Sequence, residues 1–339
     1  MKIKIEIIFY SFLFLIGINT RAAEHNLIAF SYEHFFDPYY PIITNEWPQK
    51  NSQEEKILAK AIESMPFELR NCETEAALCS YLEDQKINLF NALKTMLPST
   101  VVKRMQKAQS FFDKKLYNLH YIEQKKEDKK PPHMSIEEMN QLDKIVESFN
   151  IKSDSVSYND DSFDYSENLI VTKFNSDNMS ANHILMLEES QLKAMYTKPD
   201  SFLYTIGHEL VHAKCNDTEL EIIVLNIYNY IENKKIKNKK DEIKYKKLCS
   251  HYLQSGEMLA DIYNIAKSQF TPEQKLFIYT GGMKKTIDWM KKENIDINSK
   301  GYWDFIPATG NKTHPKDGSR LQILARAYQL VQLTLYGKK

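Results

Sequence analysis

The chain has 339 residues, of which 42% are hydrophobic and 27% are charged, with only 9 glycines and 11 prolines. This composition is typical of a globular protein and excludes a fibrous or an intrinsically disordered chain, and the length allows one large domain or two modest ones. Basic and acidic side chains both number 45, so the chain lacks the net positive charge that favours nucleic-acid binding, and we expect no nucleic-acid partner.

Residues 1–22 have the features of a secretory signal peptide. Lys2 and Lys4 precede an apolar run from Ile7 to Ile18, and small residues near Ala22 suit cleavage by a signal peptidase. The run is too short to span a bilayer comfortably, and no second long apolar segment follows it. We therefore expect a cleaved signal and an exported protein, periplasmic or secreted, with no integral membrane domain in the mature chain. An uncleaved amino-terminal anchor is the alternative.

The pattern of apolar residues divides the rest of the chain into two regions. Residues 23–122 form an amino-terminal region that reads as mostly helical from Ser52 on. Residues 123–133, EQKKEDKKPPH, carry no apolar side chain apart from the two prolines and are the best linker in the chain. The second region, residues 134–339, opens with a helix after Ser135, where Ser135 and Glu138 are spaced as a capping box.

Two short strands are expected within the second region. Asn168–Phe174 and His183–Leu187 are rich in strand-forming residues and are joined by a polar turn. Helices resume at Ser190, and a further helix begins near Asp200, a good N-cap residue. The sequence therefore predicts an α+β fold, in which a mostly helical domain with a small, mostly antiparallel sheet is preceded by a helical amino-terminal region.

The stretch GHELVHAKC, residues 207–215, places two histidines four residues apart, with a glutamate directly after the first. On a helix, His208 and His212 lie on one face and can offer two nitrogens to a single metal ion. Glu209 is rotated away from that pair but remains close enough to take a proton from a metal-bound water. This spacing is typical of zinc peptidases. The alternative is an amphipathic helix that happens to carry two histidines.

A third protein ligand has to come from elsewhere in the chain. One type of zinc peptidase needs a glycine and a third histidine shortly after the motif, but this chain has Cys215 and Thr218 at those places. Another type would use Glu232, which lies in a lysine-rich stretch. Glu257 is the better candidate, because Asp261 follows it on the same helix face and can orient a ligating histidine.

Three motifs in this order resemble a known family of enzymes. They are HELVH (His208–His212), EMLAD (Glu257–Asp261) and THPKDGSR (Thr313–Arg320). The family is the gluzincin zinc metallopeptidases that include the CAAX prenyl proteases and soluble periplasmic proteases acting on misfolded envelope proteins. The resemblance covers roughly residues 135–339. The membrane helices of the prenyl proteases have no counterpart in this sequence, so a lipidated CAAX substrate is not expected.

The resemblance implies a role for each matching residue. It assigns one zinc ion per chain to three ligands, His208, His212 and Glu257. Glu209 would be the general base, and Asp261 would orient a ligating histidine without touching the metal. His314 and Arg320 would approach from a later loop and stabilise the developing oxyanion. His314 could equally be a fourth zinc ligand that keeps the site closed.

Together these residues predict a zinc-dependent metalloendopeptidase that hydrolyses exported, unfolded or misfolded polypeptides, with Glu209 as the general base. An extended substrate would add as a strand along His183–Leu187. The alternative is an exported binding or chaperone-like protein that keeps the zinc site without proteolysis. Glu209 distinguishes the two, because a structural zinc ion needs no general base. The amino-terminal helices could in addition form a protein–protein module.

The chain contains four cysteines, an even number that suits disulfides in an exported protein: Cys72, Cys79, Cys215 and Cys249. Three pairings are possible. Cys215 follows His212 closely and Cys249 lies about two turns before Glu257, so helices that share one zinc ion would bring these two cysteines together. Cys72 and Cys79 would then pair by exclusion, which requires a turn between them. The alternative is that Cys215 is a small buried thiol.

Overall fold

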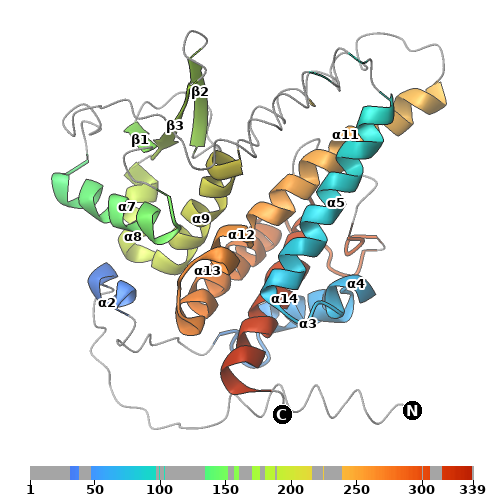
Figure 1. Ribbon diagram of the computed structural model, residues 1–339. Helices are drawn as coiled ribbons and strands as arrows, with labels where there is room; N and C mark the ends of the chain where they lie inside the picture. The colour runs from blue at the N-terminus through green and yellow to red at the C-terminus, as the bar shows by residue number, and fades with distance from the viewer. Residues whose placement is uncertain are drawn as a thin grey trace.

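Helices dominate the computed structural model, which describes residues 31–37, 47–96, 99, 103, 134–151, 156–159, 170–175, 180–187, 189–215, 224, 239–299, 301–305 and 315–337. Its elements are, in chain order, α2 (Tyr32–Phe36), α3 (Gln53–Glu63), α4 (Phe67–Arg70), α5 (Glu75–Met96), α7 (Ile136–Ser148), β1 (Val156–Asn159), β2 (Ile170–Asn175), β3 (Ser180–Met186), α8 (Glu189–Thr197), α9 (Pro199–Cys215), α11 (Lys239–Ala260), α12 (Tyr263–Lys267), α13 (Pro272–Lys292) and α14 (Asp317–Tyr336). Figure 1 shows α7, α8 and α9 grouped with the strands, while α5 and α11 run side by side.

Helix boundaries follow residues that satisfy the free backbone groups of the first turn. Ser135 Oγ accepts a hydrogen bond from the Glu138 N–H at 3.1 Å, and Glu138 Oε2 accepts one from the Ser135 N–H at 2.7 Å. This reciprocal pair confirms the predicted capping box at the start of α7. The helix α13 begins in the same way after Thr271, with Gln274 as the partner and Pro272 in the first turn.

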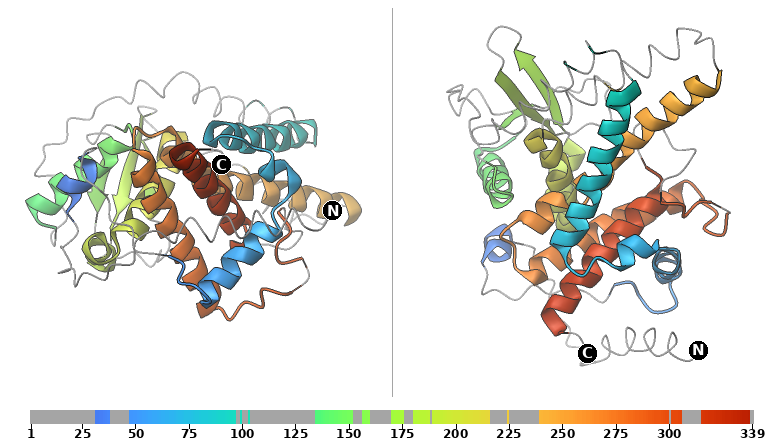
Figure 2. Two further views of the ribbon diagram at one scale, coloured as in Figure 1. Left: turned by 90° about the horizontal axis from the view of Figure 1, so that it is seen from below. Right: turned by 45° about the vertical axis from the view of Figure 1, so that its right-hand side comes forward.

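The amino-terminal helices share a core with the helices that follow residue 134. Leu82 of α5 lies in one buried cluster with Leu210 of α9 and Leu324 of α14. The view from below in Figure 2 shows α14 near the centre, with α13 on one side and α3 on the other. Across the contact between α3 and α14, Gln322 Nε2 donates to the backbone carbonyl oxygen of Ser64 at 3.0 Å. The amino-terminal helices therefore brace the helices that carry the candidate site.

The helices α9 and α13 approach each other so closely that glycine is required at the contact. A Cβ atom added to Gly281 would lie 2.2 Å from the carbonyl carbon of Asp200, and backbone atoms cannot rotate away. Ser201 Oγ donates to the Gly281 carbonyl oxygen at 3.2 Å, and Lys284 pairs with Asp200 at 2.7 Å. These contacts fix the first turn of the helix that carries both histidines of the motif.

The expected α+β class with a mostly antiparallel sheet is wrong. The described residues are mostly helical, and the strands comprise only 4, 6 and 7 residues. Their order is β1-β3-β2, with β3 antiparallel to β2 but parallel to β1. Local alternation of apolar residues indicates single strands, but it does not reveal how strands distant in sequence pair. Strands this short form a small mixed sheet beside the helices, and the helices define the architecture.

The strand pairing also corrects the expected position of a substrate. Residues His183–Leu185 pair with Val156–Tyr158 of β1 and, on the other side, with Ile170–Thr172 of β2. A substrate strand along His183–Leu187 would therefore have to displace β1 or β2. Among the described strands, the unpaired edges belong to β1 and β2, and β2 also contacts α9.

The cysteines differ from the expected disulfide pairs. Cys72, Cys79 and Cys249 are free and buried, so neither Cys72–Cys79 nor Cys215–Cys249 is formed. The Cys72 Sγ contacts the Glu68 carbonyl oxygen at 3.4 Å, whereas Cys79 lies in the helix α5 and is fully buried. The side chain of Cys215 lies outside the described residues. The shared core of helices, rather than a cross-link, holds these segments together.

None of the described helices is long and apolar enough to cross a membrane. The predicted signal peptide, residues 1–22, and the predicted linker, residues 123–133, lie outside the described residues. Export and the division of the chain into domains therefore stay predictions.

Candidate metal centre

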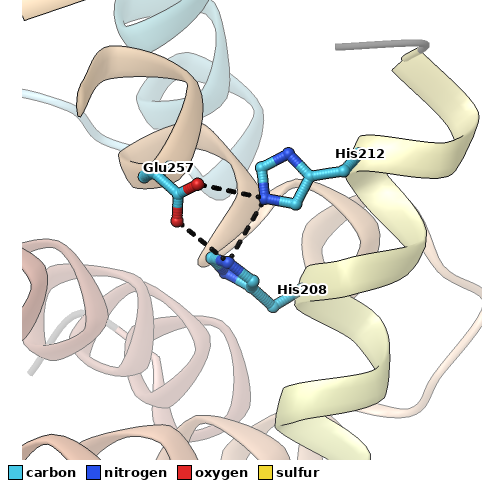
Figure 3. Close-up of side chains that lie close together, drawn as sticks. All are labelled: His208, His212 and Glu257. Carbon is cyan, nitrogen blue, oxygen red and sulfur yellow. Dashed lines mark hydrogen bonds and ion pairs between the residues drawn. The ribbon is translucent and has the colours of Figure 1, made fainter. Parts of the chain in front are cut away.

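Two long helices bring three potential metal ligands to one buried point. The helix α9 carries His208 and His212 one turn apart, and α11 carries Glu257 in its last turn. Figure 3 shows the two imidazole rings and the carboxylate converging from these two helices. The three residues are only 7%, 8% and 7% exposed. Buried polar side chains of this kind need partners, and a metal ion would satisfy all three at once.

The spacing of the donor atoms fits a tetrahedral ion. His208 Nε2 lies 3.4 Å from His212 Nε2 and 3.3 Å from Glu257 Oε2, and His212 Nε2 lies 3.5 Å from Glu257 Oε1. An ion with four ligands at about 2.0–2.1 Å has its donor atoms about 3.3 Å apart. The buried group of His208, His212 and Glu257 can therefore hold a metal ion.

Asp261 lies directly behind the first histidine. His208 Nδ1 is 2.9 Å from Asp261 Oδ1, and an Nδ1–H that donates to this oxygen leaves the Nε2 lone pair for the metal. Burial alone would lower the pKa of His208, but its hydrogen bonds with Asp261 and Glu257 outweigh burial and raise the pKa to about 9. A metal ion that binds the metal-free site at neutral pH must therefore displace a proton.

The charge of Asp261 is balanced by Arg320. Arg320 donates from Nε to Asp261 Oδ2 at 2.9 Å and from Nη2 to Oδ1 at 2.5 Å. Tyr204 donates its hydroxyl to the same Oδ1 at 2.5 Å and accepts from Arg320 Nη2 at 3.1 Å. Burial alone would raise the pKa of Asp261, but Arg320 and His208 outweigh it and lower the pKa to about 2. Asp261 is therefore a carboxylate over the whole physiological range.

These contacts give Arg320 a different position and partner from those expected. It lies in the first turn of α14 and not in a loop, and its guanidinium binds Asp261. We therefore assign Arg320 to the support of Asp261, and its expected role at an oxyanion stays a prediction. His314, the other residue expected near the reacting carbonyl, lies outside the described residues, as does Glu232, the alternative third ligand.

Glu209 lies beside the ligands without joining them. It is partly exposed, whereas both histidines are buried, and it is not one of the three converging residues. On the same side, Lys285 Nζ donates to Thr205 Oγ1 at 2.9 Å, one turn before Glu209. Lys285 keeps solvent access, yet desolvation of its ammonium and the charge of Arg320 lower its pKa, while Glu209 acts in the opposite direction. A cation therefore lies on the Glu209 side of the site.

Three residues of this neighbourhood, Tyr204, Asn264 and Lys285, were not predicted from the sequence. Tyr204 could have been found, because it lies one turn before His208 on α9. Asn264 donates from Nδ2 to the Gly207 carbonyl oxygen at 3.0 Å and ties α12 to α9 beside His208. Asn264 and Lys285 reach the site through helix packing, which no short-range pattern reveals.

The structure brings together five of the residues that the sequence singled out: His208, His212, Glu257, Asp261 and Arg320. No known protein family, curated protein or solved structure matches this chain. The function is therefore inferred from the chemistry and geometry of these residues.

Proposed function

We propose that this protein is a zinc-dependent metalloendopeptidase that hydrolyses exported, unfolded or misfolded polypeptides. The observation that carries this proposal is the buried triangle of His208, His212 and Glu257, with Glu209 next to the first ligand but outside the triangle. A glutamate placed in this way can act on a water molecule at the open position of the metal. The resemblance to gluzincin peptidases and the export of the chain remain part of the proposal.

Zinc is the ion that this set of ligands suits best. Two imidazoles and one carboxylate form a common ligand set of catalytic zinc, which keeps its fourth position for water or substrate. Structural zinc is usually bound by cysteine and histidine side chains, whereas the converging group here contains a carboxylate and no cysteine. The ligand types therefore favour a catalytic ion over a structural one.

Each side chain has a defined task in the proposed reaction. His208 and His212 would hold zinc as neutral imidazoles and Glu257 as a carboxylate, and the bound ion would supply Lewis acidity and lower the pKa of water. Glu209 would accept a proton from the attacking water as the new C–O bond forms. Glu209 would then return that proton to the leaving amine as the C–N bond breaks. Asp261 would keep His208 in the tautomer that binds the metal.

We place the substrate at the free edge of β2, Ile170–Asn175, instead of along β3. Within the described strands β2 is paired on one edge only, and it contacts the helix that carries the histidines. A strand added at this edge would be held mainly by backbone hydrogen bonds. Such binding depends little on the side chains of the substrate and requires an extended chain, which an unfolded polypeptide provides.

The burial of the ligands favours a second candidate. With all three ligands 7–8% exposed, substrate access to the ion is restricted in this conformation. A binding or chaperone-like protein that keeps zinc without proteolysis would also fit this burial. Glu209 argues for the peptidase, because a zinc ion with only a structural task has no use for a neighbouring base.

Incubation with casein tests the proposal. The mature chain, residues 23–339, should cleave fluorescently labelled casein, lose that activity on treatment with a zinc chelator, and regain it when one equivalent of zinc is returned. A protein that binds one zinc ion but leaves casein intact under all of these conditions would favour the binding protein. A protein that binds no zinc at all would contradict both candidates.

A further inference from the structure

Tyr204 lies at a junction of four helices behind the metal ligands. Tyr204 is 2% exposed, and its side chain projects from α9 one turn before His208. The ring packs against α13 at Gly282, where an added Cβ atom would lie 2.6 Å from Tyr204 Cδ2. Its hydroxyl reaches Asp261, directly after α11, and Arg320 in α14. One side chain thus connects both ligand-bearing helices with α13 and α14.

The hydroxyl of Tyr204 completes a closed set of hydrogen bonds. It donates to Asp261 Oδ1 and accepts from Arg320 Nη2, and Arg320 Nη2 also donates to the same oxygen. This oxygen is the one that lies 2.9 Å from His208 Nδ1. The position of the acceptor for His208 is therefore set from two directions, by a phenol and by a guanidinium.

Without this hydroxyl, Arg320 alone would hold Asp261. The guanidinium would lose one acceptor, and Asp261 Oδ1 would lose a donor in a position that is fully buried. The carboxylate could then rotate toward the guanidinium and away from His208, which would weaken the 2.9 Å ion-pair contact between Asp261 Oδ1 and His208 Nδ1. Partners of metal ligands commonly contribute tenfold to hundredfold in metal affinity.

We propose that Tyr204 is a positioning residue of the metal centre, which holds Asp261 so that His208 presents Nε2 to the metal ion. The proposal rests on the metal-binding part of the proposed function and is independent of proteolysis. Tyr204 is not one of the three converging residues. Its ring lies beside that of His208, with centroids 6.2 Å apart, and phenylalanine keeps this ring contact. The effect of the hydroxyl itself should therefore pass through Asp261.

The test compares two tyrosine-to-phenylalanine variants of the mature chain. Tyr279 is the matched control, because it is also buried and donates its hydroxyl to a carboxylate, Glu75 Oε1, at 2.8 Å, but on the side facing α5. Zinc affinity is measured by competition with a chromophoric chelator, and stability by urea unfolding of the chelator-treated proteins. Tyr204→Phe should weaken zinc binding about tenfold, while Tyr279→Phe should leave it unchanged at a comparable loss of stability.

A double variant shows whether the effect passes through Asp261. In the Asp261→Asn background, where zinc binding is already weakened, Tyr204→Phe should cause no further loss of affinity. Three results would each overturn the proposal. The first is that Tyr204→Phe binds zinc as tightly as wild type, and the second is that both tyrosine variants lose the same zinc affinity. The third is that Tyr204→Phe causes its full loss of zinc affinity again in the Asp261→Asn background. A wild-type chain that binds no zinc would instead contradict the proposed function itself.

Discussion

His208 Nδ1 lies 2.9 Å from Asp261 Oδ1, and this contact joins the two helices of the metal centre. His208 belongs to α9, while Asp261 directly follows α11, the helix that carries Glu257. The Asp261 N–H donates to the Glu257 carbonyl oxygen at 3.1 Å. The third ligand and the support of the first ligand are thus placed by the same turn of the chain, so the ligands cannot be positioned independently.

This contact predicts how the stability of the metal-free protein depends on pH. The pKa of His208 is raised from 6.5 to about 9 in the fold, so protonated His208 stabilises the native state fully below pH 6.5. That contribution is lost as the pH rises through 9. The free energy of unfolding of chelator-treated protein should therefore fall by roughly 1–2 kcal/mol between pH 6 and pH 8, below the range in which the buried cysteines contribute. His208→Gln should remove this slope, and an identical slope in the variant would show that other groups cause it.

The identity of the third ligand predicts a contrast between two glutamates. Glu257→Ala should lower zinc affinity by more than about a hundredfold, because even partners that do not touch the metal contribute tenfold to hundredfold. Glu232→Ala should leave zinc affinity unchanged. Both are measured as zinc bound per chain at increasing chelator concentration. A loss of zinc affinity in Glu232→Ala but not in Glu257→Ala would instead identify Glu232, in the lysine-rich segment before α11, as the third ligand.

The close contact between α9 and α13 predicts that Gly281→Ala disturbs the fold and the metal centre together. The added methyl group would meet the Asp200 backbone at 2.2–2.3 Å, so the helices must separate, at a cost of roughly 1–3 kcal/mol in the free energy of unfolding. Zinc affinity should fall as well, because α9 carries both histidines. Asp288→Ala, on the exposed face of α13, is the control and should change stability by less than about 0.5 kcal/mol.

The sequence predicted the ligand set better than the fold that supports it. The spacing of His208 and His212 and the placement of Asp261 after Glu257 are local features of helices, so the period of the helix is enough to predict them. The role of Arg320 depends on how α14 packs, which is a long-range property. The family resemblance implied a cation near the reacting carbonyl, and the structure pairs its guanidinium with Asp261.

The sheet could be predicted only in part for the same physical reason. Runs of strand-forming residues indicated strands near those observed as β2 and β3, but the pairing of β1 with β3 is a contact between distant segments. Because β3 is central, the substrate edge inferred from the strand sequence alone was misplaced. The predicted disulfide pairs were wrong for the same reason, because the spacing of cysteines along the chain does not show which thiols lie close together in the fold.

The free cysteines predict slow reaction with thiol reagents in the native state. Burial raises the pKa of Cys79 and of Cys249 to about 12, so the reactive thiolate is scarce at neutral pH. Mass mapping after alkylation without reductant should find Cys72, Cys79 and Cys249 labelled only when the protein is unfolded first. Recovery of a peptide in which Cys72 is joined to Cys79, or Cys249 to Cys215, would contradict the free-thiol arrangement.

Glu209→Gln removes the proposed general base while it keeps every metal ligand, so it separates catalysis from metal binding. The measurement is the rate of casein cleavage by zinc-loaded Glu209→Gln and zinc-loaded wild type, at equal zinc content per chain. We predict one zinc ion in both proteins and a rate at least about a hundredfold lower in the variant, which is the range for loss of a general base. A variant that carries its zinc and cleaves casein at the wild-type rate would contradict the assignment of Glu209 and the mechanism built on it.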